Sequence, residues 1–111
     1  MIRERIEQGA LRIKSERESA VVHVIELSGE LDLSSAGSLE DEIRRVESLG
    51  AREIVVDLSA LSFIDSVGLR TLRDAQSRSR EQGRLSFHRP TGHVERVLAL
   101  TGMDSFLVFA D

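Results

Sequence analysis

Two aspartates and a serine near the middle of the chain have the clearest potential for chemistry. Asp57 lies in an apolar run, and Asp65, eight residues later, is followed by Ser66. Two carboxylates can share general acid and base roles when burial drives their pKa values apart. Nothing in the sequence indicates such burial, and no histidine is placed beside Ser66 to activate its hydroxyl. A small hydrolase or nucleotide-binding enzyme using these residues is therefore the weaker hypothesis.

Other catalytic and ligand-binding groups are sparse. His23 lies inside an apolar run, while His88 and His93 flank a proline without a metal-ligand spacing. The glycines are scattered singly, so the sequence contains no glycine-rich phosphate-binding motif. Asp57 as the phosphoacceptor of a receiver domain is disfavoured, because the only lysine is Lys14 and no early acidic pair is present. We expect no catalytic residue, no metal and no cofactor.

The composition describes one domain. The chain has 111 residues, a formal net charge of -4 and no cysteine, and it is long enough to bury a core without disulfides. Residues 1–10 are expected to form a charged flexible arm and residues 11–111 a single domain. The start lacks a signal peptide and no apolar run reaches membrane-spanning length, so we expect a cytoplasmic protein without membrane insertion. Without a basic cluster, nucleic acid is not an expected partner.

Five apolar segments have the pattern of strands. Residues 11–14 alternate between apolar and polar side chains, and residues 21–27 form a β-branched run, which together predict a hairpin. Residues 54–58 are almost continuously apolar, as in a strand covered on both faces. Residues 85–87 and 106–109 are predicted as the last two strands.

Three segments have the pattern of helices. Apolar residues recur every three or four positions at 36–49, 67–83 and 94–100, and a glycine stands at or just after the end of each segment. Ser34 or Ser35 is expected to cap the first helix. The alternation of these helices with the strands predicts an α/β fold with a partly parallel sheet.

The junction after the 54–58 strand has the features of a helix start. Asp65 or Ser66 is expected to be the N-cap, because either side chain can accept a hydrogen bond from an unpaired N–H of the first turn. The helix dipole would favour a phosphate on Ser66, although the neighbouring Asp65 carboxylate would repel it. Gly68 keeps the first turn small, which would let a protein or nucleotide approach the backbone. From the residues alone, a simple cap is the commoner explanation.

Four segments together resemble the STAS family of anti-sigma-factor antagonists. They are residues 27–33 (LSGELDL), 54–59 (IVVDLS), 63–69 (FIDSVGL) and 97–104 (VLALTGMD). Their order and spacing match the family, and the resemblance covers nearly the whole chain from Leu11. It implies an α/β domain with a mixed, mostly parallel β-sheet flanked by α-helices, which acts as a binding switch and is not an enzyme.

The resemblance also implies a mechanism. In the family, the serine of the Asp-Ser pair, here Ser66, is phosphorylated by a serine kinase that is also the anti-sigma factor. The unphosphorylated antagonist binds this kinase and releases a sigma factor, phosphorylation switches binding off, and a PP2C-type phosphatase resets the switch. Asp32 matches a position near the phosphorylated serine that contacts the partner, although it can also be explained as a loop carboxylate. The expected partner-binding residues are Asp32, Asp65, Ser66, Val67, Gly68 and Leu69.

The sequence departs from the family at one position that concerns the switch. Val67 stands where the family often has Ser, Thr or Ala, which leaves Ser66 as the only hydroxyl at this helix start. STAS domains also serve as scaffolds or regulatory subunits of stress-signalling or membrane transport complexes. The intact Asp-Ser pair favours the antagonist over that alternative.

Overall fold

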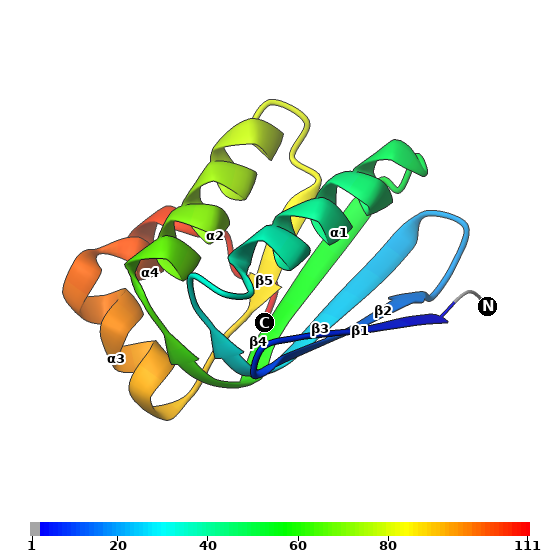
Figure 1. The fold of residues 1–111 in the computed structure, drawn as a ribbon. Coiled ribbons are helices and arrows are strands. Elements are labelled where there is room, and N and C mark those ends of the chain that lie inside the picture. The colour runs from blue at the N-terminus through cyan, green and yellow to red at the C-terminus, as the bar shows by residue number, and fades with distance from the viewer. Residues whose placement is uncertain (1–2) are drawn as a thin grey trace.

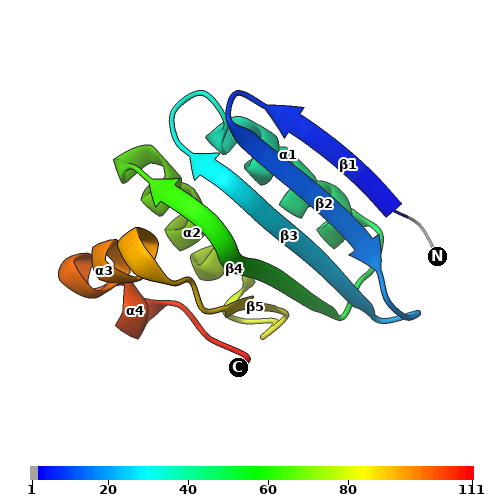
Figure 2. The same cartoon turned by 90° about the horizontal axis from the view of Figure 1, so that it is seen from below.

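The computed structural model describes residues 3–111 as a five-stranded sheet with helices on one face (Figure 1). In chain order the elements are β1 (Arg3–Gln8), β2 (Leu11–Arg17), β3 (Val22–Leu31), α1 (Ala36–Ser48), β4 (Glu53–Ile64), α2 (Ser66–Ser79), β5 (Leu85–His88), α3 (Gly92–Thr101) and α4 (Met103–Phe106). Helices α1 and α2 lie side by side over the sheet, and α3 and α4 lie beside β4 and β5 (Figure 1). Figure 2 shows the opposite face, where no helix covers β1, β2 or β3.

The sheet combines two kinds of strand pairing in the order β1-β2-β3-β4-β5. The pairs β1–β2 and β2–β3 are antiparallel, whereas β3–β4 and β4–β5 are parallel. The mixed sheet implied by the family resemblance is therefore confirmed, but the expectation that it is mostly parallel is wrong, because two of its four strand pairings are antiparallel. Because β3 and β4 are parallel, their carboxyl ends meet at one edge, where Leu31 pairs with Ile64. The loops that follow these two strands are thus brought together.

The core lies between α1, α2 and the strand faces beneath them. Alternate residues of β2, β3, β4 and β5 point toward the helices, as the period of a strand requires. The apolar stripes of α1 and α2 pack onto them. The buried residues of this layer include Leu11, Ile13, Ile25, Leu27, Ile54, Val56, Leu58, Phe87, Leu39, Ile43, Val46, Leu72 and Ala75.

Two expectations about the ends of the chain are wrong. The flexible arm expected for residues 1–10 is, over Arg3–Gln8, an edge strand paired along its length with β2; Met1 and Ile2 lie outside the described residues. Ile6 is the one apolar residue of this strand and packs against the core, but a single apolar residue gives no periodic pattern, which is why the sequence resembles an arm. The strand expected at 106–109 is replaced by α4 and a single bridge between Phe109 and Phe87. A four-residue apolar run is too short for its period to be decisive.

The other elements follow the sequence pattern with shifted ends. Strand β4 continues to Ile64, beyond the predicted 54–58, because its pairing with β3 resumes after irregularities at residues 26–30. Ser35 occupies the N-cap position of α1, although its side chain makes no capping hydrogen bond. Gly102 ends α3 with a φ of 77°, a left-handed conformation that favours glycine.

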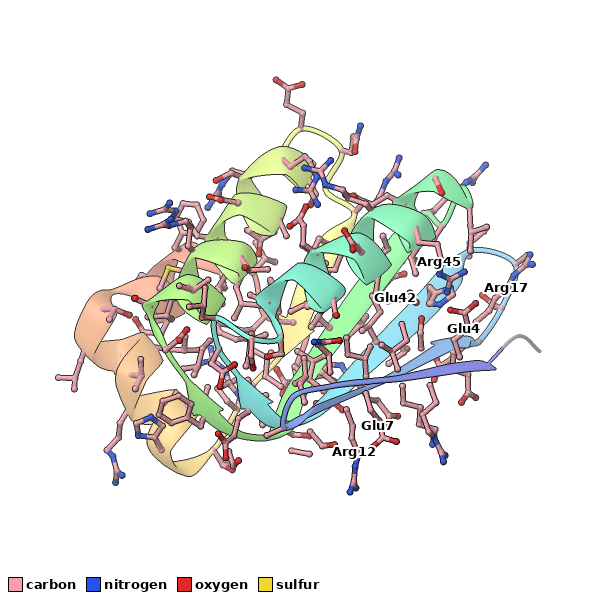
Figure 3. All side chains as sticks on the ribbon, viewed as in Figure 1. Glu4, Glu7, Arg12, Arg17, Glu42 and Arg45 are labelled. Carbon is pink, nitrogen blue, oxygen red and sulfur yellow. The ribbon has the colours of Figure 1, made fainter. Side chains whose placement is uncertain are left out.

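A cluster of polar side chains is buried between α1 and the antiparallel part of the sheet. His23 and Glu42 are each 2% exposed. The His23 Nε2 lies 2.8 Å from the Ser15 Oγ. Arg45 donates to both Glu42 oxygens, at 2.9 and 2.7 Å, and its Nη2 lies 3.2 Å from Glu4 of β1 (Figure 3). The cluster therefore ties β1 and the sheet to α1.

Burial and charge shift two pKa values in this cluster. Desolvation, aided by the positive charge of Arg45, lowers the pKa of His23 below its usual 6.5. Desolvation opposes ionisation of Glu42, but hydrogen bonds from Arg45 and Ser15 outweigh it and lower the pKa of that carboxyl. The cluster is thus held with a neutral histidine and an ionised carboxylate, and His23 is a packed core residue.

Candidate partner-binding site

One carboxylate joins the two loops at the carboxyl ends of β3 and β4. Asp65, the N-cap of α2, accepts a hydrogen bond at Oδ1 from the Gly68 N–H at 2.9 Å. Its Oδ2 accepts a second hydrogen bond from the Leu33 N–H at 3.1 Å. The Asp65 N–H in turn donates to the Leu31 carbonyl at 3.2 Å. The predicted cap is confirmed, and Asp65 also fixes the loop between β3 and α1.

Asp32 organises that same loop. Its Oδ1 accepts hydrogen bonds from the Ser34 N–H at 3.0 Å and the Ser34 Oγ at 2.6 Å. The side-chain hydrogen bond from Ser34 is the main cause that lowers the pKa of Asp32. The Ser35 Oγ accepts from the Asp32 N–H and donates to the Glu30 carbonyl. With these contacts in place, Leu33 projects into solvent with 77% of its surface exposed.

Ser66 is the first residue of α2 and is exposed. Among residues 3–111, no hydrogen bond holds its hydroxyl, which leaves that oxygen accessible from outside. Val67 and Leu69, which were expected to contact a partner, are half-buried and pack against the core. Among Ser66, Val67 and Leu69, only Ser66 therefore presents an exposed hydroxyl at this helix start.

Gly68 faces inward and is buried. A Cβ at this position would lie 2.8 Å from the Leu31 carbonyl oxygen and 2.9 Å from the Ile64 Cγ1. The expectation that Gly68 lets another molecule approach the backbone is wrong, because the end of β3 already occupies that space. Its lack of a side chain instead allows α2 to start directly against β3.

The structure adds surface residues that sequence reasoning missed. Leu33 lies in the loop fixed by Asp65. A single leucine within a polar turn, as in Asp32-Leu33-Ser34-Ser35, is the sequence feature that could have indicated an exposed contact residue. The ring of Phe63, at the end of β4, stacks on His93 with centroids 5.4 Å apart. Their contact joins residues distant in sequence, so no local pattern indicated it.

The residues considered for catalysis are not brought together. Asp57 and Asp65 are eight residues apart along and just past β4, which at about 3.3 Å per residue separates them by about 26 Å. The Asp57 Oδ1 accepts the Ser59 N–H, and its Oδ2 lies 3.9 Å from His88 Nδ1. In the described part of the chain, no three His, Asp or Glu side chains are grouped as metal ligands. Asp57 and Asp65 therefore cannot act as a general acid and base pair.

The mixed sheet, the helices on one face and the exposed serine after β4 define a STAS-type domain. The family described as "Mlab, STAS domain" matches residues 15–108. RsfB of Mycobacterium tuberculosis, named an anti-sigma-F factor antagonist, is 31% identical over 90 residues, which are 80% of this chain and 74% of the relative. The chain belongs to the STAS-domain family of anti-sigma-factor antagonists.

Solved structures agree with this assignment. An anti-sigma factor antagonist from Mycobacterium paratuberculosis is 29% identical and superimposes with a TM-score of 0.78, covering 91% of this chain and 86% of its own. Unphosphorylated SpoIIAA, 24% identical, has the same fold, with a TM-score of 0.68 over 89% of this chain and 88% of its own. Within residues 3–111, no helix is long and apolar enough to cross a membrane.

Proposed function

We propose that this protein antagonises an anti-sigma factor and that phosphorylation of Ser66 controls its binding. The unphosphorylated form binds an anti-sigma factor that is also a serine kinase, and a sigma factor is released. Phosphorylation by that kinase ends binding, and a PP2C-type phosphatase restores it. The observation that carries this proposal is the free, exposed Ser66 hydroxyl beside Asp65, whose two oxygens are both engaged by backbone N–H groups.

The electrostatics of the site support a switch without refolding. A phosphate on Ser66 adds a charge of about -1.5 to -2 next to the Asp65 carboxylate. In an interface with a partner, an unpaired buried charge costs several kcal/mol, and each 1.4 kcal/mol changes affinity tenfold. Both loops are fixed by backbone hydrogen bonds to Asp65, so this mechanism requires no refolding of the site.

The expected partner surface surrounds this serine. It comprises Ser66, Leu69 and the loop that Asp32 and Asp65 hold, from which Leu33 projects. In this proposal the protein is the substrate of the kinase and not itself an enzyme. Its place of action is the cytoplasm, where sigma factors meet RNA polymerase.

A pull-down from native extract tests the proposal. Wild type and Ser66→Ala are expected to retain a serine kinase of the anti-sigma type, whereas Ser66→Glu is expected to lose it. Ser77→Glu is the matched control, because it adds the same charge at an exposed position near the other end of α2. Mass spectrometry identifies the retained proteins.

Two outcomes would contradict the proposal. Equal retention of the kinase by Ser66→Glu and Ser77→Glu would show that charge at Ser66 does not control binding. Retention of the same membrane transport or scaffold protein by every variant would instead favour a STAS regulatory subunit.

A further inference from the structure

A groove of about 300 Å³ lies beside Ser66, between α2 and the α3–α4 junction. It is lined by Ser66, Leu69, Arg70, Arg73, Thr101 and Met103. Two of these residues are arginines and none is a carboxylate, although one of the arginines, Arg73, is paired with Asp74, which does not line the groove. The proposed function uses Ser66 and Leu69 of this groove but assigns no role to its two arginines.

Arg70 is well placed to meet a group attached to Ser66. The two residues are four positions apart on α2, so they lie one turn apart on the same side of the helix. Helical side chains lean toward the N-terminus, which directs the longer Arg70 side chain back toward Ser66. Among the residues that the structure describes, Arg70 has no ion-pair partner, whereas Arg73 lies 3.4 Å from Asp74. Arg70 is therefore the available cation.

We propose that Arg70 binds the phosphate of phosphorylated Ser66 within the chain. This inference rests on the proposed function for the premise that Ser66 is phosphorylated. The planar guanidinium can donate two parallel hydrogen bonds to phosphate oxygens, which a lysine cannot do. An acidic group four residues before a basic one is also the favourable order on a helix.

This contact adds a second element to the switch. Bound phosphate occupies the groove and neutralises Arg70, so a partner loses access to this guanidinium as well as to the free hydroxyl. The arginine also offsets the repulsion between the phosphate and Asp65. The phosphorylated form is thereby stable as a folded protein while its binding surface is altered in shape and in charge.

The test uses protein carrying genetically encoded phosphoserine at position 66, so that no kinase is required. A ³¹P NMR titration measures the pH midpoint of the second phosphate ionisation, which is near 6 for an isolated phosphoserine. Arg70→Gln is expected to raise this midpoint by about half a pH unit. The midpoint of Arg70→Lys should lie between those of Arg70→Gln and wild type. Arg96→Gln removes the same charge from an exposed position on α3 outside the groove, and its midpoint should equal that of wild type.

Equal midpoints in Arg70→Gln, Arg96→Gln and wild type would overturn the inference. Because Arg70 is exposed, its variants are expected to fold, and circular dichroism checks this. The NMR result does not depend on the partner. If Arg70→Gln raises the midpoint but Ser66→Glu still retains the kinase in the pull-down, the proposed function is refuted and the phosphate site stands. If Ser66→Glu loses the kinase but Arg70→Gln leaves the midpoint unchanged, the phosphate site is refuted and the proposed function stands.

Discussion

Replacing Asp65 tests whether one carboxylate holds two loops together. In Asp65→Asn the amide oxygen can still accept the Gly68 N–H, but the amide nitrogen cannot accept the Leu33 N–H, so one of the two hydrogen bonds is lost. In Asp65→Ala both are lost. A helix cap contributes about 1 kcal/mol, and one further hydrogen bond contributes about 1 kcal/mol. The free energy of unfolding is therefore expected to fall by about 1 kcal/mol in the Asn variant and about 2 kcal/mol in the Ala variant.

Urea unfolding measures these losses, and amide hydrogen exchange shows which bond is broken. In Asp65→Asn the Leu33 amide should exchange faster while the Gly68 amide stays protected, and in Asp65→Ala both should exchange faster. The reasoning is refuted if the two variants lose equal stability, or if Leu33 exchange in Asp65→Asn matches that of wild type.

Three further predictions concern the core and the surface. Lowering the pH through about 6.5 is expected to destabilise the fold, because His23 in the unfolded chain then takes up a proton that folded His23, with its lowered pKa, does not. Urea unfolding at several pH values measures this, and the free energy of unfolding should depend less on pH in His23→Gln than in wild type. Gly68→Ala is expected to cost about 2 kcal/mol in urea unfolding, because its Cβ would meet the Leu31 carbonyl oxygen at 2.8 Å. Leu33→Ala is expected to weaken binding of the proposed anti-sigma partner about tenfold in calorimetry without loss of stability.

The last two of these predictions each have a matched control. Gly37→Ala adds a Cβ with no atom within 4 Å, so it should stabilise α1 by up to about 1 kcal/mol. Leu49→Ala removes an exposed leucine at the far end of α1 and should leave binding unchanged. A control that behaves like its test variant would contradict the corresponding prediction.

The periodic parts of the fold were predictable because burial imposes a period on the sequence. The β-branched run of β3 and the apolar stripes of α1 and α2 each pack one face on the core, so their patterns survive in the residues. Strand β1 lacks this signal, because it pairs with β2 through its backbone and Ile6 is its one apolar residue packed against the core. One apolar residue is too few to show a period.

The candidate site was predictable only in its local part. Asp65 as a cap depends on residues three positions apart, which the sequence displays directly. Its bond to Leu33 spans 32 residues and depends on β3 and β4 being parallel. The inward direction of Gly68 has the same origin, since the residue it meets is Leu31 of another strand. Contacts between segments that are distant in sequence can be inferred only once the strand order and direction are known.

The pairing of β1 with β2 has a consequence for self-association. Strand β2 carries the buried side chains of Leu11 and Ile13, and without β1 its backbone would form an open edge next to apolar residues. Such edges recruit strands from other molecules, whereas a short, highly charged edge strand repels them. The charged strand β1 thus covers an edge of the sheet that would otherwise be open, and a chain shortened to begin at Leu11 would be expected to form intermolecular β-structure.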